Sequence, residues 1–205
     1  NKPLAFQATD WRSFDFKPPY NPETDKGRYR KEFRVQLFGV TSKGRSVSVV
    51  IKGFKPFFFA EIPTDWNDVK VEQLINTINK MIPEYEVKSL ISYDVIKQKK
   101  FRGFTNNTYY PFIKFEFQSI SGFNKYKRIL EGTIVLGGKK IQLPLYESNL
   151  EPIMRLMHIA GVEPAGWIQI SKYTMPEEPF SKCQIDIEAH FKYMTKMDKN
   201  DIAPL

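Results

Sequence analysis

Residues 67–82 read NDVKVEQLINTINKMI, and within this stretch the apolar side chains recur at steps of three and four residues. Val71, Leu74, Ile75, Ile78 and Ile82 therefore share one face of a helix, and that face must pack against another layer of the protein. Strand-like segments flank the stretch on both sides. The stretch thus predicts a helix that lies on a sheet.

The segments around this helix suggest a complete α/β unit. Lys55–Pro63 reads as a strand whose proline stands at its start, where no ladder hydrogen bond is lost. After the helix we expect two strands, a second helix and a short hairpin, at residues 85–96, 110–118, 122–130 and around Gly137-Gly138. The order strand, helix, strand, strand, helix, strand is typical of a ferredoxin- or RRM-like unit, which we place at residues 54–131.

The parts of the chain outside this unit are rich in strand signals. Residues 1–29 contain many prolines and turn formers, which predicts irregular structure with a short strand. Residues 33–40 and 46–51 read as a hairpin, and residues 167–171 and 183–189 as further strands. The expected fold class is therefore α+β. A β-rich, OB-like or barrel part, made of residues 1–53 and 132–205, wraps around the ferredoxin- or RRM-like unit.

One further helix is expected in the β-rich part. Ser148 and Glu151 have the spacing of a capping box, in which each side chain bonds the backbone amide of the other residue. Ala160-Gly161 reads as the end of this helix, because glycine readily adopts the left-handed conformation of a helix C-terminus.

Composition narrows the class of protein. The 205 residues are 41% hydrophobic and 26% charged, as in ordinary globular proteins, and no run approaches the roughly 18 apolar residues of a membrane helix. The chain has one cysteine, Cys183, which cannot form an internal disulfide and so fits a reducing, intracellular compartment. Two histidines, His158 and His190, are too few for an ordinary zinc site. We expect neither a membrane partner nor a metal site.

The net charge of +8 favours a polyanionic partner, and the charge is unevenly distributed. Nine cations face one acid between Lys26 and Lys55, and five cations face none between Lys97 and Phe115. Between Glu61 and Asp94, in contrast, seven acids outnumber three lysines. This segregation predicts one positive and one neutral side.

The segment from Lys97 to Phe104 is the best local signal for nucleic acid. It interleaves cations, which neutralise phosphates, with aromatic rings, which stack on unpaired bases. The candidate contacts are Lys97, Lys99, Lys100, Phe101 and Arg102. Because the motif only partly matches the aromatic strand of RRM proteins, burial of Phe101 in the core is the alternative.

Asp186 and Glu188 form a D-x-E triplet, the pattern with which two-metal nucleases begin. Alternation along a strand would place both carboxylates on one face, where they could hold divalent cations. Such a site needs further acids from later segments, which this chain lacks. We therefore interpret the pair as a solvated strand face and expect no catalytic residue in the chain.

Several motifs, in the same order along the chain, resemble the N-terminal domain of family B DNA polymerases. They are residues 6–11 (FQATDW), 37–41 (LFGVT), 53–59 (GFKPFFF), 145–150 (LYESNL), 155–157 (RLM), 165–170 (AGWIQI), 183–186 (CQID) and 202–205 (IAPL). The resemblance is greatest to the delta-type replicase and its relatives in large DNA viruses. It implies an excised N-terminal domain that ends just before the first exonuclease motif.

What the resemblance implies about function goes beyond these residues. The parent enzyme would extend a primer with Mg²⁺ and proofread 3′ to 5′, while this domain scaffolds the exonuclease and polymerase domains of the same chain and contacts single-stranded template DNA. It would act inside an infected host cell. The resemblance also places Arg155 opposite the template strand; the alternative is a surface ion pair with Glu151, four residues earlier.

Two rival interpretations remain at this level. The chain could be a free-standing module that binds single-stranded nucleic acid, with only a shared RRM-like or OB-like core. It could also be a nuclease that uses Asp186 and Glu188, which predicts metal-dependent cleavage.

Overall fold

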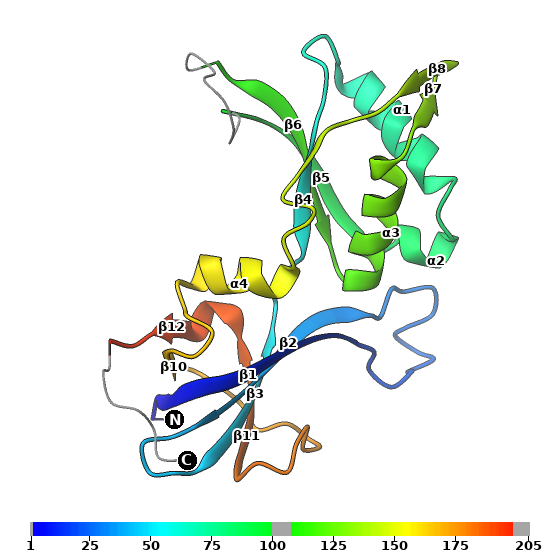
Figure 1. Ribbon diagram of the computed structural model, residues 1–205. Helices are drawn as coiled ribbons and strands as arrows, with labels where there is room; N and C mark the ends of the chain where they lie inside the picture. Colours follow the sequence, from blue (N-terminus) through cyan, green and yellow to red (C-terminus); the bar gives the residue numbers. More distant parts are fainter. Residues whose placement is uncertain (1, 100–107, 199–205) are drawn as a thin grey trace. The chain divides into compact units, whose positions relative to one another are not determined.

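The computed structural model describes residues 2–99 and 108–198, which form two compact units (Figure 1). Unit 1 contains Asn1–Phe16, Phe33–Phe54 and Glu151–Leu205, and unit 2 contains Lys17–Glu32 and Lys55–Leu150. Each unit has elements from distant parts of the sequence. The expected α+β class, with a β-rich part and a ferredoxin-like α/β part, is confirmed.

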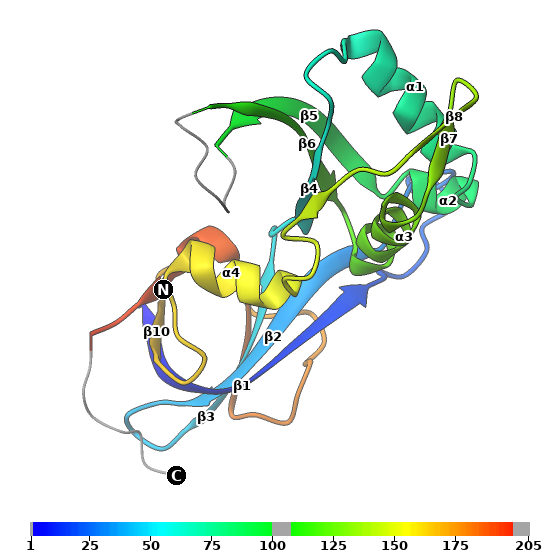
Figure 2. The same cartoon turned by 45° about the horizontal axis from the view of Figure 1, so that its top comes forward.

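Unit 1 is built on a six-stranded sheet whose strands β1 and β2 bend along their length (Figure 2). The strand order is β11-β3-β2-β1-β10-β12. The strands are β1 (Leu4–Phe16), β2 (Glu32–Val40), β3 (Ser46–Lys52), β10 (Trp167–Ile170), β11 (Ile185–His190) and β12 (Met194–Lys196). The hairpin of β2 and β3 forms as predicted, and β11 adds to β3 in parallel.

Two helical segments complete unit 1: α4 (Pro152–Ala160), which contacts β1 and β12, and the 3₁₀ turn η1 (Phe191–Tyr193). Helix α4 ends at Gly161 in the left-handed conformation, as the sequence predicts. The predicted capping box is wrong, because the helix begins only at Pro152 and its N-cap, Glu151, makes no side-chain cap bond. Proline disfavours a helical conformation in the residue before it, so the helix cannot start at Ser148.

Unit 2 has a ferredoxin-like order, β4-α1-β5-β6-α3-β9, in a sheet ordered β5-β6-β4-β9. Figures 1 and 2 show the helices on one face of this sheet. The elements of unit 2 are β4 (Phe57–Glu61), α1 (Asp68–Asn79), α2 (Glu84–Val87), β5 (Leu90–Gln98), β6 (Tyr110–Phe117), α3 (Ile120–Glu131), β7 (Ile134–Leu136), β8 (Lys139–Ile141) and β9 (Leu145–Tyr146). The last strand of the ferredoxin-like order is β9, whereas the sequence predicted the hairpin around Gly137-Gly138, which instead forms a separate two-stranded sheet of β7 and β8.

The core of unit 2 lies between the helices and the sheet. Helix α1 buries the predicted face, and Phe115 and Phe117 point into the same cluster as Ile78. Aromatic rings fill the centre, where Phe58 lies 5.2 Å from Phe123 between ring centroids. The periodicity of residues 67–82 is therefore explained by burial against this sheet.

Two other elements and the boundaries of the two units differ from the sequence prediction. Residues 84–87 form α2 rather than the start of a strand, and β1 is a strand of 13 residues where a short one was expected. The boundaries also differ, because the contacts place residues 17–32 and 132–150 in unit 2, whereas the sequence assigned them to the β-rich part. Strand β9 pairs with β4, and Ile134 and Leu143 join the core of unit 2.

Candidate nucleic-acid interface

The predicted contact residues fall in both units. Lys97 is exposed near the end of β5, and Lys99 is exposed just after it, so both belong to unit 2. Lys100, Phe101 and Arg102 lie outside the described residues. Arg155 lies in unit 1 on α4, where it is partly buried.

The register of β5 and β6 sets the direction of Lys97. Lys97 pairs with Pro111, two positions along from the pair of Val95 and Ile113. Directly opposed residues of an antiparallel pair share a face, and every second residue returns to that face. Since Ile113 lies in the core under the helices, Lys97 projects on the helix side of the sheet.

Lys97 lines a cleft of about 360 Å³ in unit 2, which we call the Lys97 cleft. The cleft lies where β5 and β6 pass the start of α1, and it is lined by Ile62, Thr64, Trp66, Asn67, Asp68, Val71, Val95, Lys97, Tyr109 and Pro111. Tyr109 is 59% exposed, and the Lys99 Nζ lies 5.6 Å from the centroid of its ring. Trp66 is partly buried against the core of the unit.

This arrangement can hold a strand by charge and by stacking. The ammonium groups of Lys97 and Lys99 can neutralise phosphates, while Tyr109 and Trp66 offer ring faces to unpaired bases. Asp68 partly offsets the positive charge of the cleft. The sequence alone did not single out either aromatic residue: Tyr109 follows the basic segment by a few positions, and Trp66 lies about 30 residues before it, ahead of α1.

Arg155 is placed by the first turn of α4. Its backbone amide donates to the Glu151 carbonyl at 3.1 Å, so the two residues are one helical turn apart. A phosphate contact and an ion pair with Glu151 both remain compatible with this position.

Asp186 and Glu188 do not form a metal site, and the expectation of a solvated face is wrong for them. Glu188 is held by two cations, with Oε1 2.9 Å from Arg34 Nη1 and Oε2 3.1 Å from Lys52 Nζ. Asp186 is buried, and its Oδ2 accepts from the Ser181 amide at 2.7 Å. A divalent ion would meet the positive charges of Arg34 and Lys52 beside Glu188.

Within residues 2–99 and 108–198 there is no group of three or more His, Cys, Asp or Glu side chains that could hold a metal ion. Among the described helices, none has the length and apolarity that crossing a membrane requires.

Comparison with known proteins identifies relatives along the whole chain. The DNA polymerase of Pyramimonas orientalis virus is 32% identical over 100% of this chain and 17% of its own length. The DNA polymerase of Paramecium bursaria Chlorella virus NY2A is 32% identical over 98% of this chain. The DNA polymerase delta catalytic subunit of Dictyostelium discoideum is 25% identical over 98% of it. The chain spans less than a quarter of the length of these relatives.

A solved structure shares the fold. The family B DNA polymerase from the hyperthermophilic archaeon Pyrobaculum calidifontis matches 98% of this chain with a TM-score of 0.62 and 16% identity, over 21% of that chain. No model of a known protein family matches the sequence.

Proposed function

We infer the function of this chain from the family to which it belongs: it is an N-terminal part of a family B DNA polymerase. We propose that the parent protein is a DNA-directed DNA polymerase with 3′–5′ exonuclease activity, which uses Mg²⁺ held outside this chain. The observation that carries the proposal is 32% identity to a viral DNA polymerase along the entire chain.

Within that enzyme, the chain scaffolds the exonuclease and polymerase domains of the same parent and contacts the single-stranded template. The Lys97 cleft supports the template contact, because it combines Lys97 with the aromatic rings of Trp66 and Tyr109, and Lys99 lies beside Tyr109. The named viral relatives support a role in DNA replication inside an infected cell.

Neutralising the two lysines tests the template contact. Each phosphate contact contributes a slope of about 0.7 to the dependence of log affinity on log salt for single strands. The double variant Lys97→Gln with Lys99→Gln should therefore lower this slope by about 1.4, and lower the affinity on the order of 20-fold at 0.1 M salt. Fluorescence anisotropy with a labelled 12-nucleotide DNA strand measures both quantities.

The matched control is Lys139→Gln with Lys140→Gln. Both lysines are exposed and adjacent on β8 of unit 2, and neither lines the Lys97 cleft. The control removes the same amount of charge at a position outside the cleft. If the cleft contacts the template, the control should therefore weaken binding far less. Equal losses in the two double variants would reduce the effect to general electrostatics and would reject the Lys97 cleft as a template contact.

A further inference from the structure

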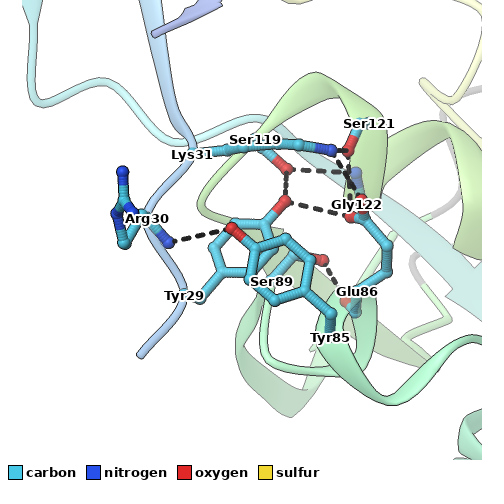
Figure 3. A network of polar contacts seen from close by, with 9 residues as sticks. All are labelled: Tyr29, Arg30, Lys31, Tyr85, Glu86, Ser89, Ser119, Ser121 and Gly122. Carbon is cyan, nitrogen blue, oxygen red and sulfur yellow. Dashed lines mark hydrogen bonds and ion pairs between the residues drawn. The ribbon is translucent and has the colours of Figure 1, made fainter. Parts of the chain in front are cut away.

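The basic stretch Arg28-Tyr29-Arg30-Lys31 divides its side chains between two sites. Tyr29 and Lys31 both reach Glu86 on α2, as Figure 3 shows. Arg28 and Arg30, the alternate residues, line a separate cleft. The contacts of Tyr29 and Lys31 therefore also restrain the backbone that carries the two arginines.

The Glu86 carboxylate is the centre of this anchor. It accepts hydrogen bonds from Lys31 Nζ at 2.7 Å, from Ser121 Oγ at 2.9 Å and from the Tyr29 hydroxyl at 3.0 Å. Burial raises the pKa of Glu86, but these hydrogen bonds and the charge of Lys31 outweigh burial and lower it overall. The Tyr29 hydroxyl also lies 2.5 Å from Ser119 Oγ, at the start of α3. The stretch is thus fastened to both α2 and α3.

The cleft beside the anchor, which we call the Arg30 cleft, has a volume of about 380 Å³. Four cationic and two acidic side chains line it together with two tyrosines, and the complete lining is Lys17, Tyr20, Asp25, Gly27, Arg28, Arg30, Glu84, Tyr85 and Lys88. All of these residues belong to unit 2, and none of them lines the Lys97 cleft.

The two acids leave much of the positive charge available. Asp25 is engaged by its own loop, where Oδ2 accepts from the Asn21 amide at 2.9 Å and Oδ1 from the Thr24 hydroxyl at 3.0 Å. It also pairs with Arg30, whose Nε lies 3.7 Å from Oδ2, so the cations left available to a ligand are Lys17, Arg28 and Lys88. Glu84 is highly exposed and lies 4.0 Å from Lys88 Nζ, a surface contact of little energy.

Arg30 is held in place without using all of its donors. Its Nη2 donates to the Pro18 carbonyl, and its guanidinium lies 5.0 Å from the centroid of the Tyr20 ring. Its Nε is buried and has no hydrogen-bond partner among the described residues. This donor faces the Asp25 carboxylate at 3.7 Å, so Arg30 serves to hold Tyr20 and the Asp25 loop in place at the wall of the cleft.

The two tyrosines add ring faces at the cleft. Tyr20 is 57% exposed and Tyr85 is 38% exposed. Tyr85 is supported by the Tyr29 ring, whose centroid lies 4.9 Å away, and its hydroxyl accepts from the Arg30 amide at 3.4 Å. One cleft therefore offers cations and exposed rings side by side.

We propose that the Arg30 cleft is a second binding site for single-stranded nucleic acid, which takes one nucleotide of the strand. The exposed side chains of Arg28 and Lys17 contact the phosphate, Arg30 supports the Tyr20 ring, and Tyr20 or Tyr85 stacks on the base. Guanidinium groups match phosphate oxygens, and rings accept any unpaired base. The volume lies at the lower end of ligand pockets, which suits a single nucleotide. An acidic peptide would use the cations but leave the ring faces without a partner.

The test is the double variant Lys17→Gln with Arg28→Gln. Both side chains are exposed and lie outside the Glu86 anchor, so the fold should be unaffected. Affinity for a labelled 12-nucleotide DNA strand should fall on the order of 20-fold at 0.1 M salt, with a salt slope lower by about 1.4. Tyr20→Ala should reduce the preference for the single strand over a duplex of equal length.

Three controls make the result decisive. Lys139→Gln with Lys140→Gln removes the same charge from the same unit, and an equal loss there would overturn the proposal. Unchanged binding by Lys17→Gln with Arg28→Gln would also overturn it, whatever the effect of the variant at Lys97 and Lys99.

Deoxynucleoside monophosphate and poly-glutamate serve as competitors. If either displaced the strand at an equal concentration of charge, the ligand would be a free nucleotide or an acidic peptide instead.

Discussion

Replacing Glu86 with alanine should loosen the anchor that holds residues 28–31. The substitution removes an acceptor shared by Tyr29, Lys31 and Ser121. Glu86 is 6% exposed, so water cannot easily replace the lost carboxylate. The direct consequence is a destabilised unit 2, and the functional consequence is an Arg30 cleft whose arginines are no longer fixed.

The size of the loss in unfolding free energy depends on which hydrogen bonds Tyr29, Lys31 and Ser121 keep in the variant. Breaking a buried ion pair costs about 3–5 kcal/mol when the remaining charge stays buried. The Lys31 side chain is 28% exposed and can regain water, which lowers the cost. Tyr29 keeps Ser119, and Ser121 keeps Lys31 at 3.0 Å. We therefore expect a loss of about 2–3 kcal/mol in the free energy of unfolding at pH 7.

The loss should depend on pH in a defined direction. The pKa of Glu86 is lowered in the folded chain from its ordinary value of 4.5. A lowered carboxylate pKa stabilises the fold above the unfolded value, and this contribution disappears as the pH falls through the folded value. The difference between the unaltered chain and Glu86→Ala should thus be complete at pH 7 and shrink below about pH 4.

Urea unfolding followed by tryptophan fluorescence measures both effects. The matched control is Glu84→Ala, which removes a carboxylate from the same short helix where the side chain is 93% exposed. It should change the free energy of unfolding by less than about 0.5 kcal/mol. A loss of less than about 1 kcal/mol for Glu86→Ala, or an equal loss at pH 7 and pH 3, would show that Glu86 does not stabilise the fold as an ionised acceptor.

Two further predictions concern the core and the absence of catalysis. Ile78→Ala should lower the free energy of unfolding by about 2–5 kcal/mol, because Ile78 is fully buried under the sheet. Val69→Ala, on the exposed side of α1, should lower it by less than about 0.5 kcal/mol. Similar values for the two variants in urea unfolding would contradict the assigned buried face. With Mg²⁺ or Mn²⁺ the chain should leave a labelled oligonucleotide intact, since Arg34 and Lys52 occupy Glu188. Degradation that Asp186→Ala abolishes would restore the nuclease interpretation.

The sequence predicted those parts of the fold whose signals are local. The period of residues 67–82 and the alternation of residues 33–51 each identify an element from neighbouring residues alone. Helix α2 was missed because Glu84–Val87 is a single turn, too short for a period to be visible. The parallel pairing of β11 with β3 joins segments about 140 residues apart, for which no short-range pattern exists.

The sequence predicted only the local part of the candidate interface, because the rest depends on contacts between distant segments. The basic segment pointed to Lys97 and Lys99, but the direction of Lys97 depends on the register of β5 with β6. Arg28 and Arg30 were visible only as members of the basic run from Lys26 to Lys55, which begins in the region expected to be irregular, residues 1–29. Their importance depends on Glu86, which lies more than fifty residues later in the sequence.

The net charge of +8 overstates how many cations can meet a nucleic acid. Arg34 and Lys52 are committed to Glu188, and Lys31 is committed to Glu86. A cation that already has a buried carboxylate partner gains little binding free energy at a phosphate, because its contact with the carboxylate must first be broken. The salt dependence of binding should therefore reflect the exposed cations of the two clefts rather than the total charge. This is why charge-matched pairs of substitutions, and not the overall pI, can separate a specific interface from a generally basic surface.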